Sequence, residues 1–427
     1  MSEQMDPLYD ALAVILENGR RARISAGDYG LLEALKERDI SVATSAAILL
    51  SNLGQPLAEI VQADSRFPGK EVRLVRGEGG GSGFYPNFIG RALVHRVLES
   101  GEPAEAIRWL EKVLSTSTAF GHSITALWGV PVDDRIHLTP EVDIVPIADL
   151  PESPQKTWIS TSMTDGFNAL LVSGLNLEPP RSALVIRKRI DHFVFAPEAP
   201  PVEGNNEYLA THELFKEITL ALTVSGPRVP IQVAHWFTFE DPDLQLANVL
   251  GSIRSQSLIE ILPRFAPNYP PLDSIEAPAM VQAYLELRGR TRDVIRVGIQ
   301  RLNQAQRRHN IGDRAVEFCT AVEALLGDNQ KTEMTHKIKS RAARLLGGSI
   351  EIRQRNAAIL GEAYAVRSSL VHTGRVDEKT KVVHGETLTR AEMVERAINM
   401  GIDIVKLIIR RGSIPDWTAF DITEQHP

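Results

Sequence analysis

The segment YAVRSSLVHTG, Tyr364–Gly374, ends a predicted amphipathic helix and carries Arg367 and His372 five positions apart. The helix starts at Ser349, and Gly374 is placed to cap its last turn. Its apolar residues recur at helical spacing and predict one buried face: Ile352, Leu360, Ala363, Tyr364 and Val371. This pattern predicts that the last third of the chain is helical.

Other helical patterns surround this segment and predict a small all-α bundle over residues 280–427. One or two helices are expected between Met280 and His309. A further helix starts at Asp313 and stops at Gly327, and another follows from Thr332. The last helix opens with a capping box from Thr389 to Glu392, in which side chain and backbone satisfy each other's hydrogen bonds.

The rest of the chain predicts a mixed α/β region with antiparallel strands, so the expected class is α+β. Residues 1–120 are expected to be mostly helical, including SVATSAAILLSNLG from Ser41 to Gly54, and the glycine run Gly77–Gly83 to form a hairpin or loop. Residues 121–262 are expected to be strand-rich, with one helix near 212–223, and 263–279 to be a proline-rich linker. The predicted strands are ITALWGV, DIVPI, KTWIST, SALVIRKRIDHFVF and VPIQVAHWFTFED.

The net charge of −7 divides unevenly along the chain. From Met280 onward there are 24 Lys and Arg against 18 Asp and Glu, which gives +6. The preceding residues have 23 against 36, which gives −13. A basic domain after an acidic one favours nucleic-acid phosphate as a partner, although a solvated helical surface explains the same charge.

Composition also bears on the compartment and on cysteine chemistry. Cys319 is the single cysteine and lies in an apolar stripe, which suits a buried thiol in a reducing cytoplasm. No run of about 18 apolar residues without charge occurs, so no membrane contact is expected. The histidines form no recognisable metal motif, and the acidic FEDPD segment at 239–243 is expected to be a solvated turn.

An arginine and a histidine together can cleave RNA without a metal. Arginine is a permanent cation that suits a phosphate, histidine can transfer a proton near neutral pH, and RNA supplies its own 2′-hydroxyl nucleophile. Three pairs have a comparable spacing: Arg187 with His192, Arg228 with His235, and Arg367 with His372. The first falls in a strand-like run and the second is interrupted by a proline. The third is predicted to lie on a helix.

Arg367 is seven residues after Leu360 and four before Val371, so it is expected to point along the apolar stripe. A buried arginine is costly unless it is paired. The candidates are Glu323 or Glu317 inside the bundle, or a phosphate at a subunit interface. Residues five apart differ by about 140° around an ideal helix, so Arg367 and His372 converge only if the last turn unwinds.

Three segments, AVEALLG, SRAARLLGG and YAVRSSLVH, occur in this order within about 60 residues. Together with the Arg and His spacing they resemble the HEPN superfamily ribonuclease domain, and most of all the ApeA-like HEPN proteins of bacterial defence systems. In those domains an Ala- and Glu-rich helix precedes a Lys/Arg-Ala-x-Leu-Leu-Gly helix and a Tyr-x-x-Arg-Ser-x-x-Val-His motif. The chain departs from many active HEPN ribonucleases at Ser368, where they have Asn, Asp or His.

The resemblance implies a metal-independent endoribonuclease that uses no cofactor. Arg367 would hold the scissile phosphate and His372 would move the proton, in a composite site where two copies meet as a homodimer through the C-terminal bundle. The residues implied to support the pair are Tyr364, Ser368 and Glu323. The RNA-binding candidates are Arg341, Arg344 and Arg375.

The resemblance also implies a role in antiviral defence, by abortive infection or as a toxin. A phage-derived or cellular trigger would then act on the N-terminal region. One alternative is a non-catalytic HEPN-like dimerisation module that binds RNA or a protein partner. Another is a purely structural role, in which Arg367 and His372 tie the helix end into the bundle.

Overall fold

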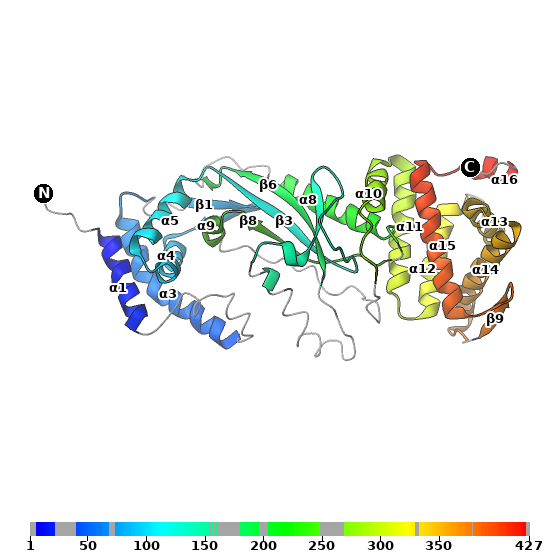
Figure 1. Cartoon of the computed structure of the whole chain (residues 1–427), viewed down its shortest axis with the longest axis horizontal. Helices are drawn as coiled ribbons and strands as arrows, with labels where there is room; N and C mark the ends of the chain where they lie inside the picture. The colour runs from blue at the N-terminus through cyan, green and yellow to red at the C-terminus, as the bar shows by residue number, and fades with distance from the viewer. Residues whose placement is uncertain are drawn as a thin grey trace.

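The structure, a computed structural model, describes residues 6–21, 40–67, 73–153, 155–157, 159, 180–195, 204–226, 228–247, 269–328, 333–377 and 379–423. The molecule is elongated, with a helical unit at its N-terminal end, a β-sheet in the middle and a helical bundle at the other end (Figure 1). The protein is α+β and its described strands pair antiparallel, as predicted. The predicted linker lies within the described residues only from Tyr269 onward.

The helices of the N-terminal unit are α1 (Pro7–Arg21), α3 (Ile40–Ala63), α4 (Pro86–Ser100) and α5 (Pro103–Ser115). We expected α3 to end at Gly54, but it continues to Ala63. The glycine serves helix packing: a Cβ there would lie 2.7 Å from the backbone nitrogen of Arg91 on α4. A Cβ at Gly90 would lie 2.2 Å from the Gly54 carbonyl oxygen, so both helices need a glycine at this crossing.

The glycine run forms a β-hairpin, one of the two predicted outcomes. Strand β1 (Arg73–Gly77) pairs with β2 (Gly80–Phe84) around a turn at Glu78 and Gly79. Gly79 has a φ of +78°, in the left-handed region that glycine adopts without strain. Strand β1 also pairs with β7 (Val194–Phe195), which joins the N-terminal unit to the chain that leaves the central sheet.

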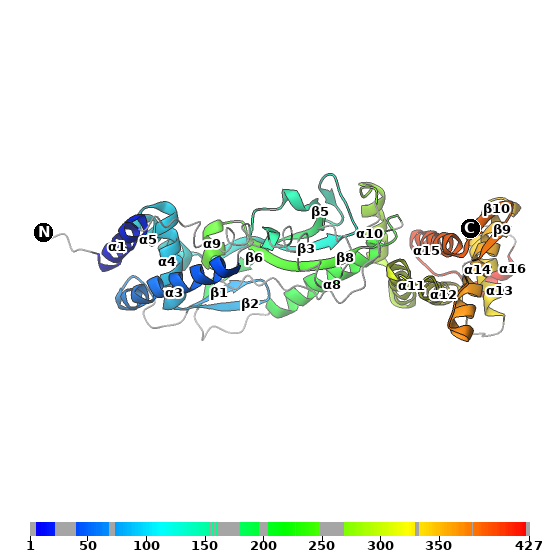
Figure 2. The ribbon, with the colours of Figure 1, turned by 90° about the horizontal axis from the view of Figure 1, so that it is seen from below.

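The central sheet has the strand order β4-β5-β6-β3-β8. Its strands are β4 (Ile136–His137), β5 (Val142–Pro146), β6 (Ser182–Asp191), β3 (Thr118–Trp128) and β8 (Ile231–Phe239). Side chains alternate between the faces, so Leu127 packs in the cluster with α8 (Gly204–Leu222), whereas Ala126 and Trp128 pack in another. Figure 2 shows α8 lying along one side of the sheet.

One predicted strand is wrong over the residues that the structure describes. The segment KTWIST, 156–161, overlaps residues 155–157 and 159, which are helical. The Ser153 hydroxyl accepts a hydrogen bond from the Lys156 backbone N–H at 3.1 Å, and the Ser153 carbonyl accepts one from Thr157 at 3.1 Å. This local serine cap favours a helical turn over the extended conformation that the β-branched residues suggested.

The C-terminal bundle consists of α10 (Glu276–Glu286), α11 (Gly289–Arg307), α12 (Ile311–Leu326), α13 (Met334–Leu346), α14 (Ile350–Thr373), α15 (Arg390–Arg411) and α16 (Trp417–Ile422). The predicted capping box between Thr389 and Glu392 is confirmed. The bundle is not entirely helical, because β9 (Thr380–Val383) and β10 (Glu386–Thr389) form a hairpin. His384 and Gly385 at its turn both have positive φ, which suits a tight two-residue connection.

The sheet and the bundle share one hydrophobic core. Leu127 and Ile186 of the sheet and Phe215 of α8 belong to the same buried cluster as Met280 and Leu302 of the bundle. Helix α8 thus packs between the sheet and α10 and α11. Helix α10 begins at Glu276, inside the segment expected to be a linker, because its first turns already bury apolar side chains against this core.

Candidate functional site

Arg367 and His372 lie near the C-terminal end of α14, which starts at the Ser349 cap and stays helical through Thr373. Gly374 caps the helix as predicted: its φ is +66°, and its N–H donates to the Leu370 carbonyl at 2.9 Å. Because the last turn does not unwind, the two side chains leave the helix about 140° apart. One chain by itself therefore does not bring them together on one face.

Arg367 pairs with Glu323 of α12, one of its two expected carboxylate partners. Nη1 of Arg367 lies 3.2 Å from Oε1 of Glu323, and the two side chains are 38% and 31% exposed. The other candidate, Glu317, pairs with Arg301 and Arg308 at 2.9 Å each. Arg367 is therefore held by one partly exposed ion pair and remains accessible from solvent.

The predicted apolar stripe differs from the observed one near this site. Val366 is fully buried, whereas Val371 is 64% exposed. Leu360, Ala363 and Tyr364 are buried as expected. Arg367 thus lies at the edge of the buried face, next to the buried Val366.

Two buried groups adjoin the Arg367–Glu323 pair. Burial raises the pKa of the Cys319 thiol, so it stays protonated at neutral pH, as expected for an inert core thiol. Burial, with added effects of Cys319 and Glu323, also raises the pKa of the Tyr364 phenol. The carboxylate of Glu323 is therefore bordered by neutral groups on one side and by the Arg367 cation on the other.

His372 and Ser368 are exposed on the outer surface of α14. The chain beyond the helix is held in place by hydroxyl groups: the Ser369 and Thr373 hydroxyls donate to the Arg375 carbonyl at 2.9 and 3.1 Å. Arg375, an RNA-binding candidate, is exposed directly after this turn. The exposed histidine and arginine thus lie close along the chain at one end of the bundle.

The β9–β10 hairpin packs along α14 near Arg355 and Glu362, toward the N-terminal half of that helix. Lys381 of β9 pairs with Glu362 of α14. Glu386 of β10 pairs with Arg355 of α14, and it accepts a 2.8 Å hydrogen bond from Nη1 of Arg396 on α15. Sequence reasoning missed these contacts, because they join residues 10 to 31 positions apart without helical periodicity.

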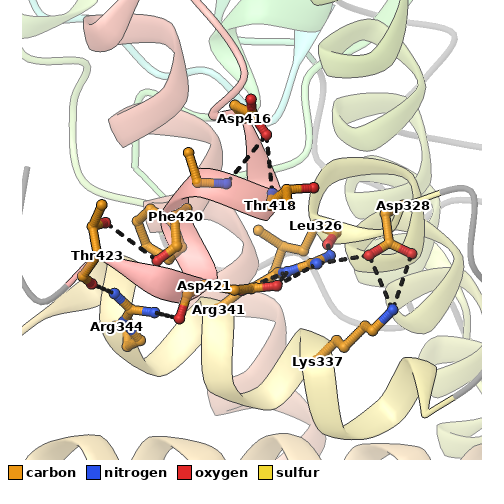
Figure 3. A network of polar contacts seen from close by, with 11 residues as sticks. Leu326, Asp328, Lys337, Arg341, Arg344, Asp416, Thr418, Phe420, Asp421 and Thr423 are labelled. Atoms are coloured by element: carbon orange, nitrogen blue, oxygen red, sulfur yellow. Dashed lines mark hydrogen bonds and ion pairs between the residues drawn. The ribbon is translucent and has the colours of Figure 1, made fainter.

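Arg341 does not face solvent, which contradicts its prediction as an RNA-binding residue. It is 1% exposed, and Figure 3 shows its guanidinium between two carboxylates. Nε and Nη2 donate to Asp421 at 3.0 and 2.7 Å, Nη2 also donates to Asp328 at 2.7 Å, and Nη1 donates to the Leu326 carbonyl at 2.6 Å. Trp417 packs under the guanidinium, with its ring centre 5.3 Å from Cζ. The side chain is structural.

Arg344 lies in the same network (Figure 3) and is half-buried. Its guanidinium donates to the Asp421 carbonyl at 3.1 Å and to the Thr423 carbonyl, and it lies 4.7 Å from the ring centre of Phe420. The two arginines therefore hold α16 against α13. Sequence reasoning missed α16 as their partner because Asp421 follows Arg341 by 80 positions.

The other two Arg and His pairs lie elsewhere. Arg187 is on β6 and pairs with Glu240 at 2.7 Å, and His192 follows that strand. Arg228 is buried before β8. His235 lies within β8, also buried, with Nδ1 2.9 Å from the Thr125 hydroxyl and Nε2 3.1 Å from the Glu78 carboxylate. Neither pair lies on a helix, as predicted.

The acidic FEDPD segment, 239–243, forms ion pairs with basic side chains of α4 and α5. Asp241 and Asp243 pair with Lys112 at 2.6 and 2.7 Å, and Asp243 also pairs with Arg96. Within the part of the chain that the structure describes, no three His, Cys, Asp or Glu side chains gather as metal ligands would. No helix among the described residues has the length and apolar character needed to cross a membrane.

A scan against protein-family models, a search of curated proteins and a search of solved structures found no match to this chain. The likeness to HEPN domains therefore rests on the three ordered sequence segments. Arg367 and His372 belong to the last of these segments. Both side chains are accessible at one end of a bundle that carries a net charge of +6 from Met280 onward.

Proposed function

We propose that the protein is a metal-independent endoribonuclease of the HEPN type that acts in the cytoplasm. The observation that carries the proposal is the exposure of Arg367 and His372 at the end of α14. Arg367 remains 38% exposed with a single carboxylate partner, so a phosphate can reach it, and His372 is exposed five residues further along. These are the two groups that RNA cleavage by its own 2′-hydroxyl needs.

The site that we propose is composite and forms in a homodimer. Because Arg367 and His372 diverge on one straight helix, pairing of two α14 ends across a twofold axis would place Arg367 near the partner's His372. The exposed Val371 between them adds apolar surface to such a contact. The 2′-oxygen would attack phosphorus, the 5′-oxygen would leave, and His372 would pass the proton while Arg367 balances the developing charge. The products would be a 2′,3′-cyclic phosphate and a 5′-hydroxyl.

The test is cleavage of RNA by the full chain in EDTA, with product ends identified by mass spectrometry. We expect cyclic-phosphate products, and a loss of at least about 100-fold for Arg367→Ala and for His372→Ala. The matched controls are Arg187→Gln on β6 and His192→Asn just after it, a pair with the same spacing, and each variant should cleave RNA as the wild type does. Asparagine is chosen because His192 has a φ of +52°, which asparagine tolerates. Intact RNA, or unchanged cleavage by both site variants, would contradict the proposal.

A second function is favoured by the Arg367–Glu323 pair itself. A carboxylate that already holds the arginine, with Ser368 in place of a stronger hydrogen-bonding side chain, suits a bundle that dimerises and binds RNA or a protein without cleaving it. That function predicts RNA binding that weakens with salt, with no cyclic-phosphate product. Measuring RNA cleavage in EDTA together with an RNA-binding titration distinguishes the two functions.

The N-terminal region would regulate the bundle in either case. Residues before Met280 carry a net charge of −13, and the bundle carries +6. We propose that this acidic region restrains the basic bundle until a phage-derived or cellular trigger binds it, as an antiviral defence or toxin effector requires. The core shared by the sheet, α8 and the bundle gives such a signal a packed route between them.

A further inference from the structure

Two buried tyrosines of the bundle lie beside carboxylates, and their hydroxyls are engaged differently. The first, Tyr284 on α10, donates a hydrogen bond from its hydroxyl to the Glu217 carboxylate of α8 at 2.7 Å. The same carboxylate is buried and also pairs with Nη2 of Arg292 at 3.3 Å and Nε of Arg296 at 2.8 Å. A phenol and two guanidinium groups therefore hold Glu217 at the same time.

The second buried tyrosine, Tyr364 on α14, lacks such a bond. It is 7% exposed, and no acceptor within the described residues meets hydrogen-bond geometry at its hydroxyl. Burial raises the pKa of this phenol, and the Glu323 carboxylate is near enough to raise it further, through its charge and as a potential acceptor. Buried hydroxyls normally have a partner. The Tyr364 hydroxyl is therefore an unused hydrogen-bond donor beside Glu323.

The Glu323 side chain has acceptor capacity that its present contact does not use. Its Oε1 lies 3.2 Å from Nη1 of Arg367, which is its one ion pair within the part of the chain that the structure describes. A carboxylate has about four acceptor positions, so one contact leaves room for a second donor. The side chain is also 31% exposed, so it can turn without opening the core. Glu323 can thus exchange partners, whereas Glu217 is enclosed by its three donors.

We propose that Glu323 alternates between Arg367 and Tyr364 and thereby controls the access of RNA to Arg367. In the empty site the carboxylate holds Arg367. When an RNA phosphate binds Arg367, the displaced carboxylate accepts a hydrogen bond from the Tyr364 hydroxyl, which stabilises its charge and keeps it from the phosphate. This regulation rests on the proposed function. It makes Tyr364 a positioning residue that acts through Glu323.

The first test needs no RNA and measures the rate at which phenylglyoxal modifies Arg367 in the full chain, by mass spectrometry. Pairing with a carboxylate shields a guanidinium from this reagent. Glu323→Gln should therefore speed the modification by about two- to fivefold, the range that an exposed ion pair provides. Tyr364→Phe keeps the ring and removes the alternative partner of Glu323, so it should slow the modification by a similar factor.

A double-mutant cycle isolates the contact between Tyr364 and Glu323. In the Glu323→Gln background, which lacks the carboxylate charge, Tyr364→Phe should leave the modification rate unchanged. The matched control is Tyr284→Phe, which removes a hydroxyl bonded to a different carboxylate. It should lower the Tm and leave Arg367 modification as in the wild type. Equal rates in the wild type and Tyr364→Phe, or the same slowing in the Glu323→Gln background, would overturn the proposal.

RNA binding separates this regulation from the proposed function. Where the wild type binds RNA, Tyr364→Phe should weaken binding by about two- to fivefold and leave the cleavage rate of bound RNA unchanged. Unchanged binding in that variant would overturn the regulation while leaving the proposed function intact. A wild type that neither binds nor cleaves RNA would contradict the proposed function, and the modification rates would still decide whether Glu323 exchanges its partners.

Discussion

Arg341 and Arg367 belong to two of the sequence segments that resemble HEPN domains, and they lie in contrasting surroundings within the same bundle. Arg341 is 1% exposed and contacts two carboxylates and a backbone carbonyl. Arg367 is 38% exposed and contacts one carboxylate. The first has its donors satisfied inside the protein, whereas the second is open to solvent beside its single partner. Occurrence in these segments therefore does not tell whether an arginine is enclosed by the protein or open to solvent; the number of acceptors around it does.

The largest expected effect is on stability, at Arg341. Arg341→Met removes the group that joins α13 to Asp421 of α16 and to Asp328, and leaves both carboxylates without it (Figure 3). Breaking a buried ion pair in this way typically costs about 3 to 5 kcal/mol. Because Asp328 and Asp421 are 25% and 38% exposed, we expect about 3 kcal/mol, measured by urea unfolding.

Arg344→Gln is the control for this prediction. Arg344 is a half-buried arginine of the same helix. Among the described residues, its hydrogen bonds go only to backbone carbonyls at and after the end of α16. The expected cost is about 1 kcal/mol. Equal losses of unfolding free energy in the two variants would show that the ion pairs with Asp328 and Asp421 do not stabilise the protein more than the hydrogen bonds of Arg344 do. That result would contradict the contrast drawn for Arg341.

The next prediction concerns activity at Arg367. Arg367→Ala removes an ion pair whose two side chains are about one-third exposed, so it should change the unfolding free energy by less than about 1 kcal/mol. If the proposed function holds, the same substitution lowers RNA cleavage by at least about 100-fold. Urea unfolding and cleavage measured on one preparation separate the two effects. A loss of stability as large as that at Arg341 would assign Arg367 a structural role.

The sequence predicted local features well and long-range partners poorly. The capping box at Thr389 and the cap at Gly374 were predictable because their geometry depends on neighbours in the chain. The α3 helix passes through Gly54 because α4 packs against that position, a contact that local propensity cannot contain. Likewise, no periodic pattern links Arg341 with Asp421, although Glu323 was one of the two carboxylates considered for Arg367, beside a phosphate.

A smaller effect is expected at Glu323, which under the proposed function would compete with RNA for Arg367. Glu323→Gln removes the negative charge but keeps the shape of the side chain. The Arg367 guanidinium then loses its ion pair and is more available to an RNA phosphate. An exposed ion pair is worth about 0.2 to 1 kcal/mol, which corresponds to RNA binding that is up to about fivefold tighter. The control is Glu395→Gln, which makes the same charge change at a different ion pair, with Arg314. Equal gains in the two variants would attribute the effect to net charge alone.

The smallest effect is expected in the β9–β10 hairpin, which packs along α14 near Arg355 and Glu362. The hydrogen bond from Arg396 lowers the pKa of Glu386, so this carboxylate stabilises the hairpin above its ordinary pKa of 4.5. That contribution is lost as the pH falls through the lowered pKa of the folded state. Hydrogen exchange of hairpin amides, corrected for the intrinsic rate at each pH, should show less protection in Glu386→Gln than in the wild type at pH 7, with the difference vanishing under strong acid. Amides of α11 provide the internal control. A difference that persists in acid would mean that the Glu386 charge does not hold the hairpin against α14 and α15.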